Sequence, residues 1–130
     1  MSREAMILYW IEKAEQDIAS AKDNYTAERL VNAVREAYFA CFPAFSALLL
    51  KDEKTFKKHR EVRAALHRDY IRTQKMEPEW GKHYDWLFDN RQKADYRPFV
   101  QFESDQVIEI IEKSEAFVYV LKNKSINKQF

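Results

Sequence analysis

Apolar residues recur at helical spacing from the start of the chain. The first series has steps of four, three, four and three residues, and consists of Ile7, Ile11, Ala14, Ile18 and Ala21. These steps place the series on one face of an α-helix. The pair Asp23 and Asn24 indicates a break after it. We predict that Thr26 caps the next helix and that Glu28 lies in its first turn, where a negative charge is favourable.

The second helix is predicted from a longer apolar series, made up of Leu30, Val34, Ala37, Cys41, Phe45 and Leu48. Between Ala37 and Leu50 the chain is apolar nearly all round, and Ser46 is the one strongly polar side chain. A helix that is apolar on every side must be buried on every side. The run is shorter than the ~20 apolar residues of a membrane span, and Pro43 is expected to kink it. We therefore predict the central helix of a bundle, with apolar surface left over for a second subunit.

Three further helices complete the expected fold. They run from about Arg60 to Arg72, from Pro78 to near Tyr96, and from Ser104 to about Leu121. Pro78 suits the first position of a helix, where its missing N–H costs nothing. The polar tail, residues 122–130, is expected to fray. The pattern predicts one domain over residues 1–130, an all-α, up-and-down bundle of about five helices.

Composition removes several classes of site. The 130 residues contain one glycine, which excludes a glycine-rich dinucleotide fingerprint or phosphate loop. The single cysteine, Cys41, excludes an intramolecular disulfide and a zinc site built from several cysteines. The three histidines, His59, His67 and His83, do not fall at a metal-ligand spacing on one helix. We expect neither a metal nor a cofactor.

The first residues do not resemble an export signal. Residues 1–13 contain Glu4 and Glu12, and they lack the basic start and small-residue cleavage site of a signal peptide. We expect a soluble cytoplasmic protein that does not associate with a membrane.

Arg91 is the first candidate for chemistry. It continues the inner line of the fourth predicted helix, which consists of Trp80, Tyr84, Leu87, Arg91 and Ala94. Asp95 follows one turn later. One interpretation is an intrahelical ion pair without function, which contributes a few tenths of a kcal/mol. The other is an anion-binding arginine held in place by Asp95, because the planar guanidinium suits a phosphate group.

Charge is unevenly spread, although the formal net charge is only +1. Residues 51–75 contain nine Lys and Arg against four Asp and Glu. Such a region is either a basic face for RNA phosphates or an ordinary solvated helix surface. For a cluster of this size we favour the solvated surface.

Four stretches carry a family resemblance. They are Ala14 to Ile18 (AEQDI), Ala33 to Leu49 (beginning AVREAYFACF), the pair Lys58-His59, and Arg91 to Tyr96 (RQKADY). In this order and at these spacings they resemble a HEPN domain over most of the chain. The similarity is closest to the small prokaryotic HEPN proteins whose fourth helix ends in Arg-x-x-Ala-Asp-Tyr.

The resemblance implies a helical bundle that usually dimerises and is often paired with a minimal nucleotidyltransferase in toxin–antitoxin systems. Active members of the family are metal-independent ribonucleases with an arginine, four to six residues, and then a histidine. The histidine handles the proton of the RNA 2′-hydroxyl, and the arginine steadies the phosphate.

This chain departs from that pattern. Four residues separate Arg91 from the motif position, which holds Tyr96 in place of histidine. A phenol with a pKa near 10 is a poor base at neutral pH. Arg60 and His67 have the required spacing, but they belong to the third helix, so we treat that match as accidental. Pro43 stands where a bulky or polar residue is usual in the family.

The prediction is a HEPN-like homodimer that binds a nucleotide, RNA or a nucleotidyltransferase partner. Arg91 binds the anion, Asp95 orients Arg91, and Tyr96 supplies a hydroxyl. Arg35 and His59 are further members of the site. Two alternatives stay open: an active ribonuclease toxin that takes its histidine from His59, and a purely structural interaction module.

Overall fold

The computed structural model describes residues 2–126, and within them the chain forms five α-helices and no strand. The helices are α1 (Arg3–Thr26), α2 (Leu30–Lys51), α3 (His59–Ala65), α4 (Pro78–Tyr96) and α5 (Ser104–Ser125). A short π-helical segment, η1 (Leu66–Ile71), follows α3 directly. The predicted all-α bundle of about five helices is confirmed.

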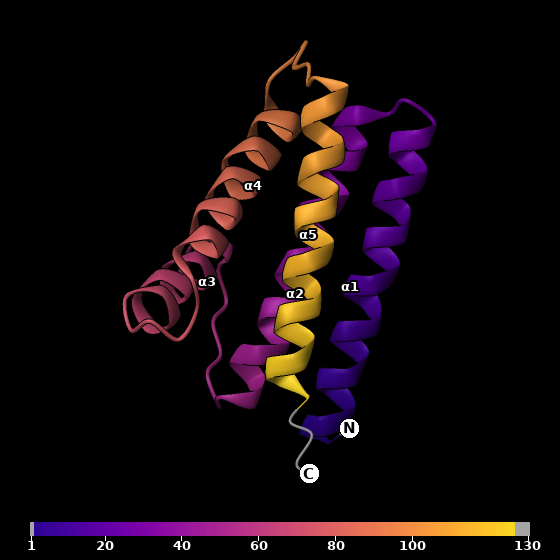
Figure 1. The fold of residues 1–130 in the computed structure, drawn as a ribbon. Coiled ribbons are helices and arrows are strands. Elements are labelled where there is room, and N and C mark those ends of the chain that lie inside the picture. The colour runs from indigo at the N-terminus through magenta and orange to yellow at the C-terminus, as the bar shows by residue number, and fades with distance from the viewer. Residues whose placement is uncertain (1, 127–130) are drawn as a thin grey trace.

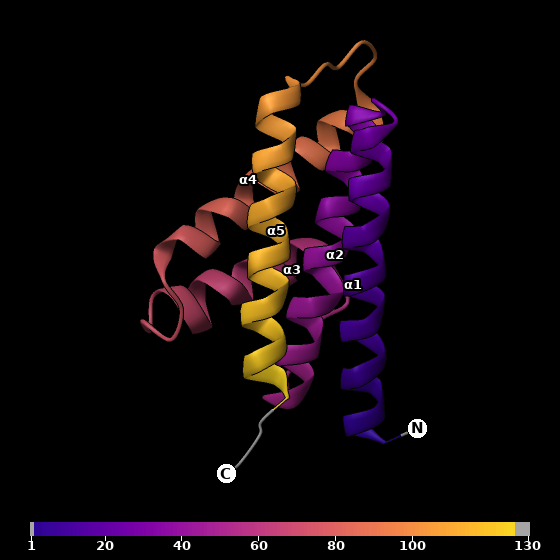
Figure 2. The same ribbon diagram turned by 45° about the vertical axis from the view of Figure 1, so that its right-hand side comes forward.

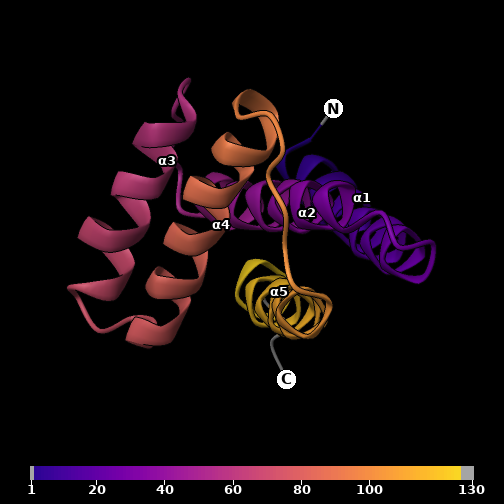
Figure 3. The same cartoon turned by 90° about the horizontal axis from the view of Figure 1, so that it is seen from above.

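Three long helices, α1, α2 and α5, lie side by side and form the main body of the molecule (Figure 1). The α3–η1 segment and α4 lie next to each other as a hairpin that crosses the direction of the long helices (Figure 3). The loop between α4 and α5 passes over the end of the bundle where α1 meets α2 (Figure 2). The end of α4 therefore lies beside the first half of α2.

The α2 helix is the centre of the core and packs against α1, α4 and α5. Twelve of its 22 residues are buried, among them Tyr38, Cys41 and Phe45. By length and hydropathy alone α2 could span a membrane, but 67% of its most apolar window is buried inside the bundle. Burial in the core accounts for its hydropathy, as the apolar pattern predicted. The helix continues through Pro43, which is itself buried.

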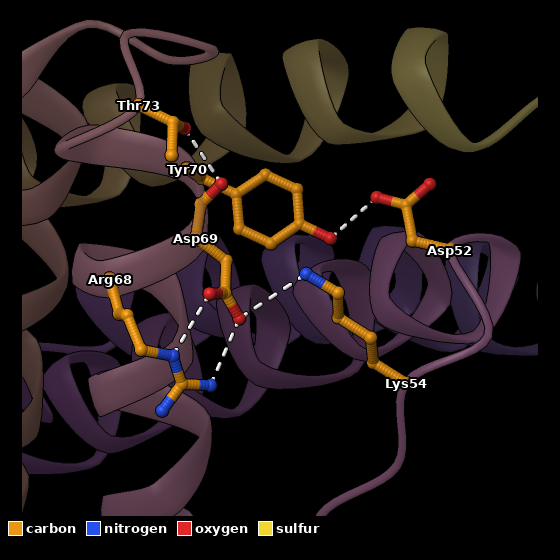
Figure 4. A network of polar contacts seen from close by, with 6 residues as sticks. All are labelled: Asp52, Lys54, Arg68, Asp69, Tyr70 and Thr73. Atoms are coloured by element: carbon orange, nitrogen blue, oxygen red, sulfur yellow. Dashed lines mark hydrogen bonds and ion pairs between the residues drawn. The ribbon is translucent and has the colours of Figure 1, made fainter.

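A polar network ties the end of α2 to η1 (Figure 4). The Tyr70 hydroxyl donates a hydrogen bond to Asp52, just beyond the end of α2. Asp69 accepts two hydrogen bonds of 2.9 Å from the Arg68 guanidinium and lies 3.2 Å from Nζ of Lys54. The Arg68 hydrogen bonds lower the pKa of Asp69 to about 2. These contacts fix where the α3–α4 hairpin leaves the bundle.

The junction between α1 and α2 differs from the prediction. Thr26 is the last residue of α1, not the cap of α2, and Glu28 has a positive φ of 62°. The Arg29 N–H donates to the Asn24 carbonyl at 2.8 Å, and the Glu28 N–H donates to Tyr25. This backbone pattern is a Schellman motif, in which one left-handed residue ends a helix. The polar residues therefore mark the end of α1 and do not cap the start of α2.

The expected fraying after Leu121 is wrong for residues 122–125, which continue α5 as far as Ser125. Lys122 pairs with Glu15 of α1 at 3.1 Å, and the Lys124 carbonyl accepts a hydrogen bond from Lys51 at 2.8 Å. These tertiary contacts hold a polar turn in the helix. Residues 127–130 lie outside the described part of the chain.

A buried histidine joins α4 to α5. Nε2 of His83 lies 2.9 Å from the hydroxyl of Ser114, and both side chains are buried. Burial lowers the pKa of His83 to about 4, so the imidazole is neutral in the folded protein at pH 7.

This buried imidazole predicts a loss of stability in mild acid. In the unfolded chain His83 regains a pKa near 6.5, so below that pH the unfolded state binds more protons than the folded state. The free energy of unfolding should fall by up to about 3 kcal/mol between pH 7 and pH 4 through this group alone. Urea denaturation at a series of pH values measures the fall. The variant His83→Gln should show a shallower decline, and equal slopes in the two proteins would contradict the assignment.

Candidate functional site

Arg91 lies where α4 packs against α2. Its side chain is only 15% exposed, in agreement with its predicted place on the inner line of α4. The guanidinium carbon is 5.0 Å from the ring centroid of Tyr38 and 5.9 Å from that of Phe39. Contact with an aromatic face compensates part of the cost of burying a cation.

Asp95 is shared by two arginines from different helices. Its Oδ2 atom is 3.2 Å from Nη1 of Arg91, which is the predicted contact one turn along α4. Its Oδ1 atom is 2.7 Å from Nε of Arg35 on α2. We call these three residues the Arg91 cluster. Two guanidinium groups and one carboxylate leave it with a formal charge of +1.

Nε of Arg91 is buried and has no hydrogen-bond acceptor within residues 2–126. A buried donor without a partner is unfavourable, and the cost is larger for a charged group. Arg35 contributes the more accessible guanidinium, with 42% of its side chain exposed. Nε of Arg35 likewise lacks a hydrogen-bond acceptor within the described residues. The cation of the cluster that an incoming anion can reach is therefore Arg35, and Arg91 is the buried cation beside it.

His59 reaches the same place from the start of α3. Its Nδ1 atom is 2.7 Å from the hydroxyl of Tyr38, and its ring stacks on Phe42 with 4.1 Å between the centroids. Burial lowers the pKa of His59, and the positive charge of Arg91 lowers it further. Burial raises the pKa of Tyr38, so the phenol keeps its proton at neutral pH. The site thus contains a neutral imidazole beside a neutral phenol.

Comparison with known proteins now identifies the family. The HEPN domain profile matches residues 7–124. This chain belongs to the HEPN family. It is 39% identical to the "UPF0332 protein" of Thermotoga maritima over 116 residues, which is 89% of this chain and 88% of that protein. It is 28% identical to the "Putative toxin MJ0142" of Methanocaldococcus jannaschii over 118 residues, 91% of this chain and 80% of that protein. The resemblance drawn from four short stretches is confirmed.

The HEPN fold brings together four of the five residues predicted for the site. Arg91, Asp95 and Arg35 form one ionic cluster, and His59 joins it through Tyr38. Tyr96 is not part of this group. It ends α4 with 78% of its surface exposed, and five residues after Arg91 it lies about 140° further around the helix.

Two residues at this site were not predicted from the sequence. Tyr38 connects Arg91 to His59, and Phe42 supports the imidazole ring. One signal was available for Tyr38: a tyrosine inside a helix that is apolar on every side needs a partner for its hydroxyl. Nothing in the pattern of α2 indicates that the partner comes from α3.

What His59 can do chemically depends on which of its ring nitrogens carries the hydrogen. In the tautomer in which the phenol of Tyr38 donates to Nδ1, Nε2 of His59 carries the hydrogen and acts as a donor. Such a group can add a hydrogen bond to an anion held by the arginines, but it has no free lone pair with which to accept a proton. No group of three or more His, Cys, Asp or Glu side chains placed to hold a metal occurs in the described part of the chain.

The electrostatic link between Arg91 and His59 can be measured. The variant Arg91→Gln should raise the pKa of His59 toward 6.5, because a nearby positive charge is removed while most of the burial stays. An NMR titration of the imidazole resonances reports the value directly. Arg3→Gln, which removes one positive charge near the start of α1, serves as the control and should leave the pKa of His59 unchanged. An unchanged His59 pKa in Arg91→Gln would show that the two residues do not share one environment.

Proposed function

We propose that this HEPN protein binds RNA at the Arg91 cluster and is the toxin-type member of a toxin–antitoxin pair. The observation that carries the proposal is the sharing of Asp95 by Arg35 and Arg91, which leaves the cluster with a net positive charge and with guanidinium nitrogens that have no hydrogen-bond acceptor. Arginine forks match the oxygen atoms of a phosphate group. The bound group is the phosphate of RNA or of a nucleotide.

The relationship to the archaeal protein named as a toxin supports the biological part of the proposal. The pair would act in the cytoplasm, and the second member would be a minimal nucleotidyltransferase. A gene for such an enzyme beside the gene for this chain would support the pair. Without it, the purely structural interaction module becomes the better interpretation.

We further propose that the protein cleaves RNA weakly or not at all. The family's motif places a histidine where this chain has Tyr96, and that side chain is exposed to solvent and turned away from Arg91 around α4. A tyrosine with a pKa near 10 is only about a thousandth ionised at pH 7. The rate acceleration that a general base supplies, typically about 10²–10⁴-fold, is then largely lost.

The alternative is an active metal-independent ribonuclease that uses His59. One observation favours it: His59 and Arg91 contact the same ring, Tyr38. In the tautomer in which Nδ1 donates to the phenol, Nε2 has a free lone pair and can act as a base.

Assembly as a homodimer is part of the proposal. Val31, Phe39 and Phe42 lie along α2 at steps of eight and three residues, and all are half-buried. This stripe runs beside the Arg91 cluster. Phe99, in the loop after α4, is 96% exposed. A second copy packed along α2 and α4 would cover these apolar groups and place two clusters near one another, with the two-fold symmetry common in homo-oligomers.

RNA binding tests the main proposal. Arg91→Gln should weaken the binding of a single-stranded RNA about ten-fold or more in fluorescence anisotropy, because a charge-assisted hydrogen bond to phosphate is lost. Arg3→Gln is the matched control, since it also removes an arginine from an ion pair, with Glu53, and should bind as the wild type does. Circular dichroism verifies the fold. An Arg91→Gln protein that fails to fold would mean that the ion pair is structural, and equal affinities would reject the site.

Incubation with total RNA in the presence of a chelator tests cleavage. The wild type should be nearly inert, and Tyr96→His should gain activity if the motif histidine is what is missing. Strong cleavage by the wild type that is lost in both Arg91→Gln and His59→Ala would contradict the prediction and establish the ribonuclease alternative.

Light scattering at tens of micromolar tests the dimer. The wild type should have twice the mass of the chain, and Val31→Arg should shift it toward the monomer because a charge enters the α2 stripe. Leu8→Arg, at an exposed apolar position on α1, is the control and should stay dimeric. A monomeric wild type would contradict the proposed assembly.

A further inference from the structure

A second basic region lies on the α3–α4 hairpin. A groove of about 640 Å³ between the α3–η1 segment and α4 is lined by the arginines Arg60, Arg63, Arg68 and Arg72, together with His67 and Asp85. The five basic residues are spaced by three, four, one and four positions, and all of them line the groove. The row runs along the whole α3–η1 segment. We call the groove lined by these residues the arginine groove.

The two ends of the groove carry unpaired charge. Within residues 2–126, neither Arg60 nor Arg72 has a carboxylate at ion-pair distance. The middle of the row is anchored. Arg68 is held by Asp69 (Figure 4), and Arg63 lies over the ring of Phe88 at 4.2 Å. The row is therefore held in shape at its centre and is available to a ligand at both ends.

His67 contributes to the shape of the groove. Its Nε2 atom is 2.8 Å from Oδ1 of Asp85 on α4. The chain's one glycine, Gly81, lies against the other side of the ring, where an added Cβ would be 2.9 Å from Cε1 and 3.3 Å from Nδ1. Asp85 therefore holds the imidazole against α4, and the absence of a side chain at Gly81 leaves room for the ring. The Nε2 atom of His67 is engaged by Asp85, so the spacing of Arg60 and His67 does not by itself make a ribonuclease pair.

The lining indicates the class of ligand. A linear row of cations suits a linear polyanion better than a single compact anion. The lining's one apolar residue is Ala64, whereas the centre of a protein–protein interface is rich in aromatic and other apolar side chains. Aromatic residues on which bases could stack do not line the groove either. The expected contacts are with phosphates and sugars, which position a strand without reading its sequence.

We propose that the arginine groove binds the sugar–phosphate backbone of single-stranded RNA and directs the strand toward the Arg91 cluster. The two sites are connected by contact: Arg63 covers Phe88, Phe88 packs against Tyr38, and Tyr38 lies under Arg91. The part of this inference in which the strand is directed to the Arg91 cluster rests on the proposed function. The groove itself is a separate site with its own test.

The test compares ligands of two lengths. Arg60→Gln/Arg72→Gln should bind a 20-nucleotide RNA at least ten-fold more weakly than the wild type, and should bind a mononucleotide with unchanged affinity. Loss of two phosphate contacts should also reduce the slope of log affinity against log salt by about 1.4 for a single strand. Oligo-A and oligo-U should be affected equally. Both arginines are exposed and unpaired in the described structure, so the fold should be intact by circular dichroism.

The control is Lys22→Gln/Lys122→Gln, which removes the same charge from the α1–α5 face, where each lysine is paired with a glutamate. It should bind the 20-nucleotide RNA as the wild type does. An equal loss in this control, a loss confined to one base sequence, or unchanged affinity of the groove variant would overturn the inference. Arg91→Gln separates the two proposals. If the groove variant binds RNA weakly and Arg91→Gln binds it normally, the Arg91 cluster is rejected as the binding site. If Arg91→Gln binds RNA weakly and the groove variant binds it normally, only the groove is rejected.

Discussion

The burial of Tyr38 at the centre of α2 determines the arrangement of the candidate site. Its side chain is fully buried, and a buried phenol needs a hydrogen-bond partner. His59 supplies that partner, which fixes the first residue of α3 against α2. The same ring supports the guanidinium of Arg91 from α4. Three helices thus meet at one aromatic side chain, and its contacts position His59 and Arg91, the main candidates for a functional role.

The Arg91 cluster follows from the cost of placing a cation in this position. A half-buried guanidinium among aromatic rings loses much of its hydration, and a paired carboxylate compensates the loss. Asp95 provides this pairing and simultaneously binds Arg35. Because one carboxylate serves two arginines, the cluster stays positive. That positive charge lowers the pKa of His59, which is already lowered by burial. The same electrostatics that favour an anion therefore disfavour a protonated histidine beside it.

Much of this arrangement could be predicted from local sequence, and the contacts that could not be predicted are those that depend on how the helices pack. Helical periodicity placed Arg91 on the inner face of α4 and Asp95 one turn later, because both are properties of a single helix. The pairing of Asp95 with Arg35 and of His59 with Tyr38 depends on how helices pack, which periodicity does not encode. The prediction that Thr26 caps α2 was wrong for a similar reason. The polar residues there end α1 through backbone hydrogen bonds and a left-handed Glu28. The polar turn after Leu121 is helical through contacts with residues distant in sequence.

The α3–η1 segment connects the two basic regions, because it carries His59 at its first residue and the arginine row along its length. Three separate contacts hold this segment. His59 binds Tyr38, Tyr70 binds Asp52 at the end of α2, and His67 lies between Asp85 and Gly81 of α4. The π-helical turn begins at Leu66, directly before His67. A π turn changes the direction of the side chains that follow it, and such turns are frequent at functional sites. The orientation of the arginine row therefore depends on this turn as well as on the row's spacing in the sequence. The position of the imidazole beside Arg91 depends on the same segment being held in place.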